Sequence, residues 1–299
     1  MPAFCKIQVL KWSVWVDKDM RMEIKMKKAF TLVELLVVIS IIALLLSIMM
    51  PALQKAKKLG QSSICLANIR QIAVAYQCYS IENNGKLMPS RIRQGRKTAW
   101  VQFPQDKYGN NKWSLTKQGT LEERIFGITA GLMYPYLKTI KVYYCSGDLR
   151  MVEGTHAERS YSMIGCLNGW SNDVPAEQYM YDRQIRKMDE IKSTSTSYML
   201  VEEADSRGFN MTWWSLVAPE HGANPPMWWN PLAVLHGDSS TIAFCDGHAR
   251  LYKWREKLTL SLAKKQMLPG EMYGATPVPD GQKRDIDFMY DGWAYRYNP

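Results

Sequence analysis

The stretch from Phe30 to Met50, FTLVELLVVISIIALLLSIMM, decides the broad class of this 299-residue protein. Glu34 is its one charged residue, and apolar residues dominate the remainder. As an α-helix it would be about 31 Å long, which is close to the hydrocarbon thickness of a bilayer. A buried core helix is seldom apolar on all faces over such a length. We therefore predict a membrane-spanning helix here.

A cleavable secretory signal peptide is the competing interpretation of this stretch. The apolar segment is long for the hydrophobic region of such a peptide, and no small-x-small cleavage site precedes the exit at residues 51–54. Positive charge does not determine the orientation of the helix, because Lys27 and Lys28 precede it and Lys57 and Lys58 follow it.

Glu34 needs an explanation, because a carboxylate in a membrane helix costs about 2.5–3.5 kcal/mol. It ends the segment KKAFTLVE at residues 27–34, which resembles the processing site of type IV prepilins and type II secretion pseudopilins. The resemblance implies that a prepilin peptidase cuts between Ala29 and Phe30 and methylates the new amine of Phe30. It also implies that Glu34 sets subunit register by pairing with the Phe30 ammonium of a neighbouring subunit, which relieves the cost of burying either charge.

The same resemblance divides the N-terminal region. Residues 1–29 become a leader, and a start at Met26 would leave only MKKA. The family usually has glycine before the cut, where this chain has Ala29, and many members carry a helix-loosening proline where this chain has Pro51. The side chains implied to form the membrane helix and filament core include Phe30, Leu35, Val38, Ile42, Leu46 and Pro51.

Helical periodicity continues after Pro51. Apolar residues recur at helical spacing from Leu59 to Tyr76, and the Asn-Asn-Gly sequence at 83–85 predicts a helix end. We predict one helix from about Leu32 to Glu82. Residues 30–53 would form its transmembrane and filament-core part, residues 54–84 an amphipathic continuation packed on a sheet, and residues 85–299 an exported head. The predicted class is α+β with a mostly antiparallel sheet.

A second motif lies in the head, where His236 is followed after nine residues by Asp246 and Gly247. This spacing resembles the H-x9-DG processing-associated group of prepilin-like proteins, abundant in Planctomycetes and Lentisphaerae. The apolar segments at 241–245 and 248–254 flank Asp-Gly, so a β-hairpin with a type I′ turn is predicted within residues 236–254.

Two roles are open for the H-x9-DG residues. In the structural one, His236 bonds the turn region and fixes the incoming loop. In the other, His236, Asp246 and His248 bind zinc or another transition metal. No CxxC and no pair of histidines four apart on a helix supports a metal. Calcium at the acidic residues 202–205 is a further option by analogy with pseudopilin heads. We expect no cofactor.

The cysteines of the head permit a disulfide, because an exported domain meets oxidising conditions. Removal of the leader leaves five of the six cysteines: Cys65, Cys78, Cys145, Cys166 and Cys245. Cys65 and Cys78 would lie about 20 Å apart on one helix and cannot bond each other. Cys145–Cys166 is the preferred pair.

Tryptophan pairs at 213–214 and 228–229 bracket a proline-containing segment. They either pack in a small satellite core or form an exposed aromatic platform for glycans or a protein partner.

The predicted function is that of a non-enzymatic pilin or pseudopilin subunit. The net charge of +10 is not concentrated in a dense basic stripe, so no nucleic-acid partner is expected. Neither G-x-S-x-G nor H-E-x-x-H occurs in the sequence. The resemblance implies a prepilin peptidase, other pilin subunits packed through their helices, and an inner-membrane assembly platform as partners. It implies a single-pass inner-membrane protein with its head in the periplasm or on the cell surface.

Two alternatives stay open. One is a membrane-tethered glycan- or metal-binding surface protein that uses the prepilin-type signal only for export and anchoring. The other is a monotopic membrane protein with an uncleaved anchor.

Overall fold

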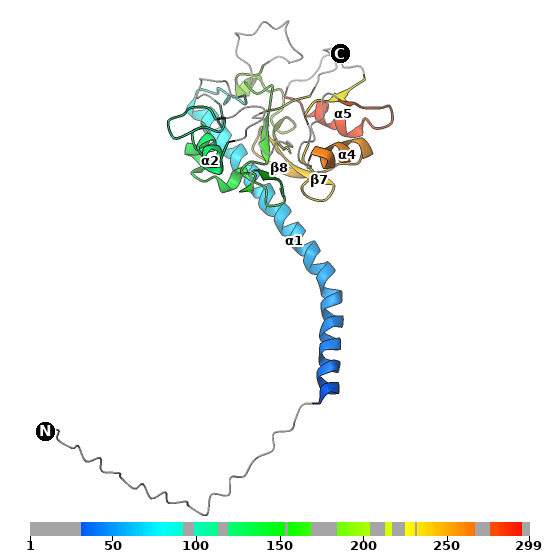
Figure 1. Ribbon diagram of the computed structural model, residues 1–299. Coiled ribbons are helices and arrows are strands. Elements are labelled where there is room, and N and C mark those ends of the chain that lie inside the picture. Colours follow the sequence, from blue (N-terminus) through cyan, green and yellow to red (C-terminus); the bar gives the residue numbers. More distant parts are fainter. Residues whose placement is uncertain are drawn as a thin grey trace, which may run out of the picture. The chain divides into compact units, whose positions relative to one another are not determined.

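The fold is described from a computed structural model (Figure 1). The structure describes residues 31–91, 99–112, 119–152, 155–168, 184–203, 213–216, 225–230, 232–266 and 276–294. The chain divides into two compact units, Met1–Ala52 and Leu53–Pro299. The α+β class is confirmed: a long N-terminal helix precedes a head built on a mixed, mostly antiparallel sheet.

Helix α1 spans Leu32–Glu82, as the periodicity predicts, and is drawn from blue to cyan in Figure 1. Its large apolar side chains between Leu32 and Met50 are 45% to 78% exposed. The helix is long enough and apolar enough to cross a membrane. This surface finds no partner among the described residues of the first unit.

In the second unit, one face of α1 enters the core of the head. Cys65 is its first buried residue, followed at helical spacing by Ile69, Ile72 and Tyr76. The buried face starts later than the periodicity predicts, because Leu59 is 61% exposed. The Asn-Asn-Gly sequence ends the helix as expected. Asn84 and Gly85 have φ of 56° and 77°, and the Gly85 N–H donates to the Ser80 carbonyl at 2.8 Å.

The main sheet has five strands in the order β5-β3-β4-β7-β8, with only the β3–β5 pair parallel. The strands are β3 (Tyr161–Ile164), β4 (Tyr198–Glu202), β5 (Trp213–Trp214), β7 (Ser239–Phe244) and β8 (Ala249–Lys253). Every residue of β3, β4 and β7 is buried, which makes these central strands part of the core.

The β7–β8 hairpin is confirmed, but its turn differs from the prediction. A type I′ turn needs positive φ at both central residues, and among the described non-glycine residues with positive φ Asp246 does not appear. Gly247 has φ of 90°, and its N–H donates to the Phe244 carbonyl at 3.0 Å. The Phe244 N–H donates to the His248 carbonyl at 2.9 Å. The loop therefore has three residues with a left-handed glycine at its end.

Shorter elements surround the sheet. The helices are α2 (Leu121–Thr129), α3 (Tyr134–Leu137), η1 (Lys141–Tyr143), η3 (Met188–Glu190), α4 (Lys257–Gln266) and α5 (Arg284–Asp291). The remaining strands form two antiparallel pairs, β1 (Met151–Val152) with β2 (Thr155–His156), and β6 (Met227–Trp228) with β9 (Thr276–Pro277). A capping box between Thr120 and Glu123 starts α2.

The structure buries one tryptophan of each pair in the head. Trp214 and Trp228 are buried, with ring centroids 6.3 Å apart, and Trp228 lies 6.3 Å from Trp254 on its other side. Trp213 and Trp229 are half-buried. The rings of Trp214 and Trp228 therefore pack in the core, and an exposed glycan platform cannot include them.

We predict that Trp228→Ala lowers the free energy of unfolding by about 3–5 kcal/mol, because it leaves a large cavity between two aromatic rings. Chemical denaturation of the full chain in detergent, followed by tryptophan fluorescence, measures the change. Tyr108→Ala is the control, since Tyr108 is 76% exposed and its loss should change stability by no more than about 0.5 kcal/mol. Equal effects of the two substitutions would contradict this packing.

Candidate functional site

Helix α1 begins with a capping box made by Thr31 and Glu34. The backbone N–H and the hydroxyl of Thr31 both donate to Glu34 Oε2 at 2.9 Å, and the Glu34 N–H donates to Thr31 Oγ1 at 3.2 Å. Glu34 thus has a local role at the start of the helix, in addition to any role between subunits. Ala29 and Phe30, the predicted cleavage and methylation residues, lie outside the described residues.

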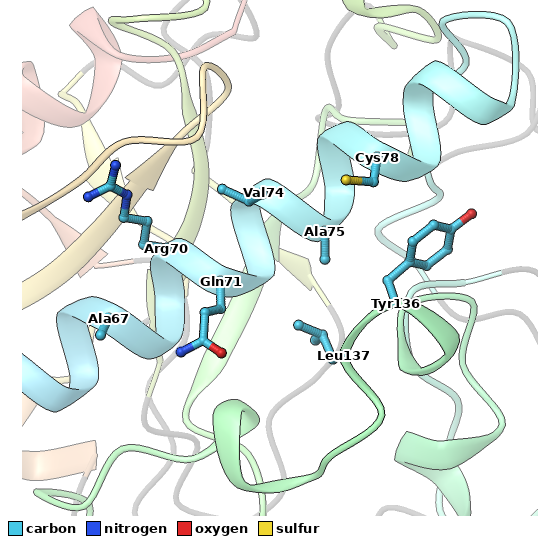
Figure 2. A pocket seen from close by; sticks show the side chains of 8 residues that line it. All are labelled: Ala67, Arg70, Gln71, Val74, Ala75, Cys78, Tyr136 and Leu137. Atoms are coloured by element: carbon cyan, nitrogen blue, oxygen red, sulfur yellow. The ribbon is translucent and has the colours of Figure 1, made fainter.

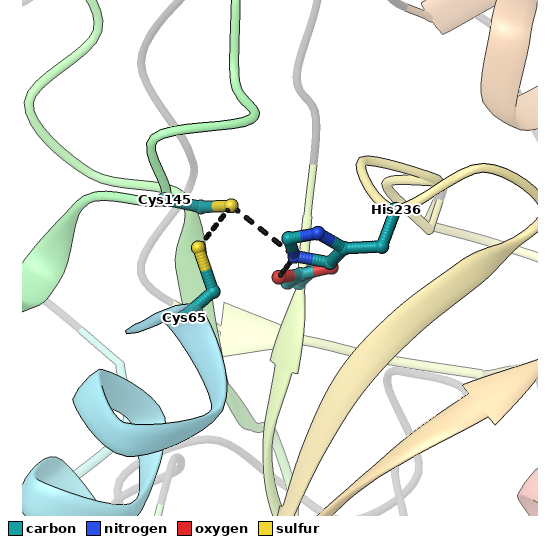
Figure 3. Close-up of side chains that lie close together, drawn as sticks. Cys65, Cys145 and His236 are labelled. Carbon is teal, nitrogen blue, oxygen red and sulfur yellow. Dashed lines mark hydrogen bonds and ion pairs between the residues drawn. The ribbon is translucent and has the colours of Figure 1, made fainter. Parts of the chain in front are cut away.

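A second constellation lies in the head, where four side chains from separate segments converge. They are Cys65 of α1, Cys145 of the turn after η1, Glu202 at the end of β4 and His236 of the loop before β7. Figure 3 shows the two sulfur atoms and the His236 ring facing one another. The ligand atoms of the four residues all lie within 4.8 Å of one another.

The distances define a chain of contacts through this cluster. Cys65 Sγ lies 2.7 Å from Cys145 Sγ, which in turn lies 3.4 Å from His236 Nε2. The same nitrogen lies 3.0 Å from Glu202 Oε1. Glu202 is fully buried, and the His236 side chain is 2% exposed. Two thiols, an imidazole and a carboxylate are therefore held together away from water.

The turn that carries Cys145 is fixed by a buried polar network. The Asp148 N–H donates to the Cys145 carbonyl at 2.9 Å, and the Cys145 N–H donates to Ser160 Oγ at 3.0 Å. Ser160 donates to Asp148 Oδ2 at 2.8 Å, and Arg150 forms an ion pair with the same oxygen at 2.5 Å. A Cβ at Gly147 would lie 2.8 Å from the Leu235 carbonyl oxygen, so glycine lets the loop before His236 approach this turn.

Glu202 and His236 are each oriented by a further hydrogen bond. Thr241, on the neighbouring strand β7, donates its hydroxyl to Glu202 Oε1 at 2.8 Å and its N–H to Oε2 at 3.1 Å. Ser62 Oγ lies 3.2 Å from His236 Nδ1, so Nε2 is the nitrogen that faces the sulfur atoms and the carboxylate.

The electrostatics of the cluster differ between its two thiols. The hydrogen bond with Cys145 and the nearby His236 lower the pKa of Cys65, against the opposing effect of burial. The hydrogen bond with Cys65 and burial raise the pKa of Cys145. Burial alone would lower the pKa of His236, but its contacts with Cys65 and Glu202 raise it to about 10. Burial raises the pKa of Glu202 despite the opposing bonds from His236 and Thr241.

The structure does not bring together His236, Asp246 and His248, the predicted metal ligands. His236 precedes strand β7 and Asp246 follows it, and six residues of strand span roughly 17 Å. Asp246 Oδ1 instead lies 2.6 Å from His248 Nδ1 in a solvent-exposed pair. The structural interpretation predicted a bond between His236 and the Asp246–Gly247 turn. The same separation keeps His236 away from that turn. Gly247 lies against α1, where a Cβ would be 3.0 Å from Gln77 Oε1.

Two other expectations can be compared with the geometry. Cys145, whose preferred disulfide partner was Cys166, has its sulfur against Cys65. The acidic residues proposed for calcium are buried where they are described, and both are engaged within the head: Glu203 Oε1 accepts a hydrogen bond from Asn230 at 3.4 Å, and Glu202 belongs to the cluster. These carboxylates do not form an open loop site.

A groove of about 510 Å³ lies between α1 and α3 on another face of the head. Figure 2 shows Tyr136 and Leu137 of α3 across from Ala75 and Cys78 of α1. Arg70 is its one lining residue with a formal charge at neutral pH. The groove lacks the converging polar side chains of the cysteine–histidine cluster.

Comparison with known proteins bears on the N-terminal region. Residues 24–50 match the prokaryotic N-terminal methylation motif. The chain is also 39% identical over 57 residues to the type IV wide pilus major component PilA4 of Thermus thermophilus. That alignment covers 19% of this chain and 44% of the relative, so less than half of the relative's length is spanned. No solved structure matches the chain.

Sequence reasoning placed His236 and Cys145 among the candidates but missed Cys65 and Glu202 as their neighbours. Cys65 carried a signal, because it follows the helical spacing of Ile69, Ile72 and Tyr76 and so shares the buried face of α1. Glu202 carried a weaker one, as a carboxylate directly after the apolar strand 198–201.

We predict that Asp148→Asn lowers the free energy of unfolding by about 3–5 kcal/mol, because it leaves the buried Arg150 guanidinium without its counter-charge. Thermal and chemical unfolding of the full chain measure the loss. Asp238→Asn serves as the matched control, since Asp238 is exposed. A change below about 1 kcal/mol for Asp148→Asn would mean that the network does not stabilise this turn.

Proposed function

We propose that this chain is a pilin-like structural subunit, anchored by α1 as a single-pass inner-membrane protein, with its head in the periplasm or on the cell surface. A prepilin peptidase cleaves it before Phe30 and methylates the new amine. Subunits then leave the membrane and pack α1 against α1 in a type IV pilus or a type II secretion pseudopilus, with an inner-membrane platform as the assembly partner.

The observation that carries the proposal is the coincidence of three features in one short region. The methylation motif covers residues 24–50. The large apolar side chains of α1 between Leu32 and Met50 are exposed. Glu34 places a carboxylate in the first turn of the same helix. An apolar helix alone needs only a membrane, whereas a helix that begins with this motif and this carboxylate is suited to both processing and assembly.

The charges at the start of α1 support a role for Glu34 between subunits. Cleavage would leave the Phe30 ammonium directly before the capping residue Thr31, near the positive end of the helix dipole, where a cation is unfavourable. The Thr31 bonds to Glu34 both end on Oε2. Among the described residues Oε1 accepts no hydrogen bond, and it can receive an ammonium from a neighbouring subunit.

The head has a non-enzymatic role in this proposal, as the surface that the subunit presents outside the helical core. The His236 to Gly247 spacing supports membership of the H-x9-DG group of prepilin-like proteins. Burial of Trp214 and Trp228 weighs against the alternative of a glycan-binding surface protein that uses the signal only for export.

We predict that co-expression with a prepilin peptidase converts the full chain to a product that begins with methylated Phe30. Intact-mass and terminal-peptide mass spectrometry of the membrane fraction, with and without the peptidase, measure the conversion. An N-terminus that the peptidase leaves unchanged would reject processing and return the chain to the class of uncleaved membrane anchors.

We predict that Glu34→Gln preserves cleavage and the start of α1 but reduces filament or oligomer yield at least tenfold. Glutamine can replace glutamate in a capping box, yet it carries no charge to pair with the ammonium. Thr31→Ala is the matched variant, because it removes the cap, at a cost of about 1 kcal/mol, and keeps the carboxylate.

Sheared-filament yield and negative-stain microscopy of cells that carry the assembly machinery compare the two variants. Thr31→Ala should assemble at near wild-type yield. Normal assembly of Glu34→Gln would show that the carboxylate charge does not set subunit register.

A further inference from the structure

We propose that Cys65, Cys145, Glu202 and His236 form a closed zinc site that fixes helix α1 to the head. The four residues come from four separate segments of the second unit, and their ligand atoms lie within 4.8 Å of one another (Figure 3). A single ion bound to all four would join α1, the turn after η1, strand β4 and the loop before β7.

The donor chemistry favours zinc over calcium or magnesium. Two thiolates and an imidazole are soft or borderline ligands, which hard oxygen-seeking cations avoid. Two sulfurs, one nitrogen and one carboxylate oxygen supply the four donors of a tetrahedral zinc site. Because all four positions come from the protein, no position is left for water or substrate, and the site is structural rather than catalytic.

Two of three donor separations are close to the edges of a zinc tetrahedron, and the sulfur–sulfur separation is shorter. With zinc bonds of about 2.3 Å to sulfur and about 2.0–2.2 Å to nitrogen and oxygen, the edges are about 3.8 Å for S–S, 3.6 Å for S–N and 3.3 Å for N–O. The corresponding separations are 2.7, 3.4 and 3.0 Å. Zinc entry therefore requires the sulfur atoms to separate by about 1 Å, which small rotations of the two cysteine side chains supply.

The surroundings of the donors match the outer shell that a metal site needs. Ser62 Oγ lies 3.2 Å from His236 Nδ1, so the imidazole can donate there while Nε2 keeps its lone pair for the metal. Thr241 holds both oxygens of the Glu202 carboxylate. The Gly147 N–H points to Cys145 Sγ at 3.3 Å, and the backbone of Ser146 contacts the sulfur of Cys65. Backbone N–H donors of this kind stabilise charged sulfur.

A Cys65–Cys145 disulfide is the competing product, and it accounts for less of the structure. It would use the two sulfur atoms alone and form a neutral, apolar link. The buried Glu202 carboxylate and His236 imidazole, each with its own orienting hydrogen bond, would then serve only as a pair with each other. Zinc uses all four groups, and its two positive charges offset most of the negative charge of the two thiolates and the carboxylate.

Zinc binding exchanges protons for the metal and involves no change of oxidation state. Zinc binds Cys65 and Cys145 as thiolates, Glu202 as carboxylate and His236 as neutral imidazole. Protons held by the thiols or by the imidazole are released to solvent, and no oxidant or reductant takes part. Binding therefore weakens as pH falls, because protons compete for the sulfur and nitrogen atoms.

The first test uses the full chain, purified in detergent without chelators after expression in zinc-containing medium. We expect one zinc per chain by elemental mass spectrometry, and a cobalt-substituted form with thiolate-to-cobalt charge-transfer and tetrahedral d–d absorption. Intact mass and thiol titration on the same sample report any disulfide. A metal-free protein whose mass is lower by two hydrogens, with Cys65 linked to Cys145, would overturn the proposal.

Variants then separate the ligands from bystanders. His236→Ala and Cys145→Ser should lose zinc, whereas the controls Cys78→Ser and His248→Ala should keep it, because Cys78 is exposed, His248 is half-buried beside Asp246, and both lie outside the cluster. A ligand variant could simply fail to fold, so Ser62→Ala provides the milder test. Loss of the imidazole partner should weaken zinc affinity by 10–100-fold in chelator competition without unfolding the head.

Unchanged zinc content in His236→Ala and Cys145→Ser would place any bound metal elsewhere and reject this site. The result is independent of the proposed assembly function, since zinc content is measured on the isolated subunit. A chain that binds zinc and fails to assemble would reject only the assembly proposal.

Discussion

The exposed apolar surface of α1 between Leu32 and Met50 is the constraint on which the rest of the protein depends. Burying one leucine, isoleucine or valine side chain is worth about 1.5–3 kcal/mol, and well over ten such side chains in this segment are about half exposed or more. No described part of the first unit covers them. In the proposed function this surface faces lipid before assembly and the helices of other subunits afterwards, so that one apolar surface serves two successive environments.

In the second unit the same helix packs against the head instead of exposing apolar side chains on all faces. From Cys65 onward only one face of the helix is buried: Ile69, Ile72 and Tyr76 enter the core of the head, where the Tyr161 hydroxyl bonds the Cys65 carbonyl. The change from an all-round apolar pattern to a single buried face occurs without a break in the helix. The polar residues Arg70 and Gln71 are exposed and line the groove between α1 and α3.

Local patterns explain which parts of the fold were predictable. The limits of α1, its Asn-Asn-Gly end and the β7–β8 hairpin follow from the periodicity and turn chemistry of neighbouring residues. The prediction of a type I′ turn was wrong, because Gly247 takes a positive φ and Asp246 does not. The prediction that the apolar face is covered from Leu59 onward was wrong, because periodicity identifies an apolar face but not the point along the helix at which the head begins to cover it.

The cysteine–histidine cluster could not be predicted from the sequence, because local patterns do not say which distant segments meet. Its members are separated by up to 171 positions, from Cys65 to His236, and no local rule states which segments of a sheet protein meet. The H-x9-DG spacing suggested a single site around the hairpin, but a strand of six residues keeps its ends apart. Cys166 was the preferred partner of Cys145, whereas the packing of the Cys145 turn on α1 places its sulfur against that of Cys65.

The position of Cys65 gives the proposed zinc site a mechanical meaning. In the proposed filament, a load along the α1 helices would have to pass to each head through the contacts that α1 makes with it. Cys65 is the first buried residue of α1 and lies three residues after Ser62, whose hydroxyl contacts His236, so the load would reach the head at this part of the helix. Apolar contacts resist sliding weakly, because dispersion is non-directional and each atom pair contributes only about 0.1–0.2 kcal/mol. The metal–ligand bonds of the proposed site would be directional and short, one to Cys65 of α1 and three to β4, the loop before β7 and the turn after η1. A site at this point would transfer the load to the central strands of the sheet rather than to the surface loops.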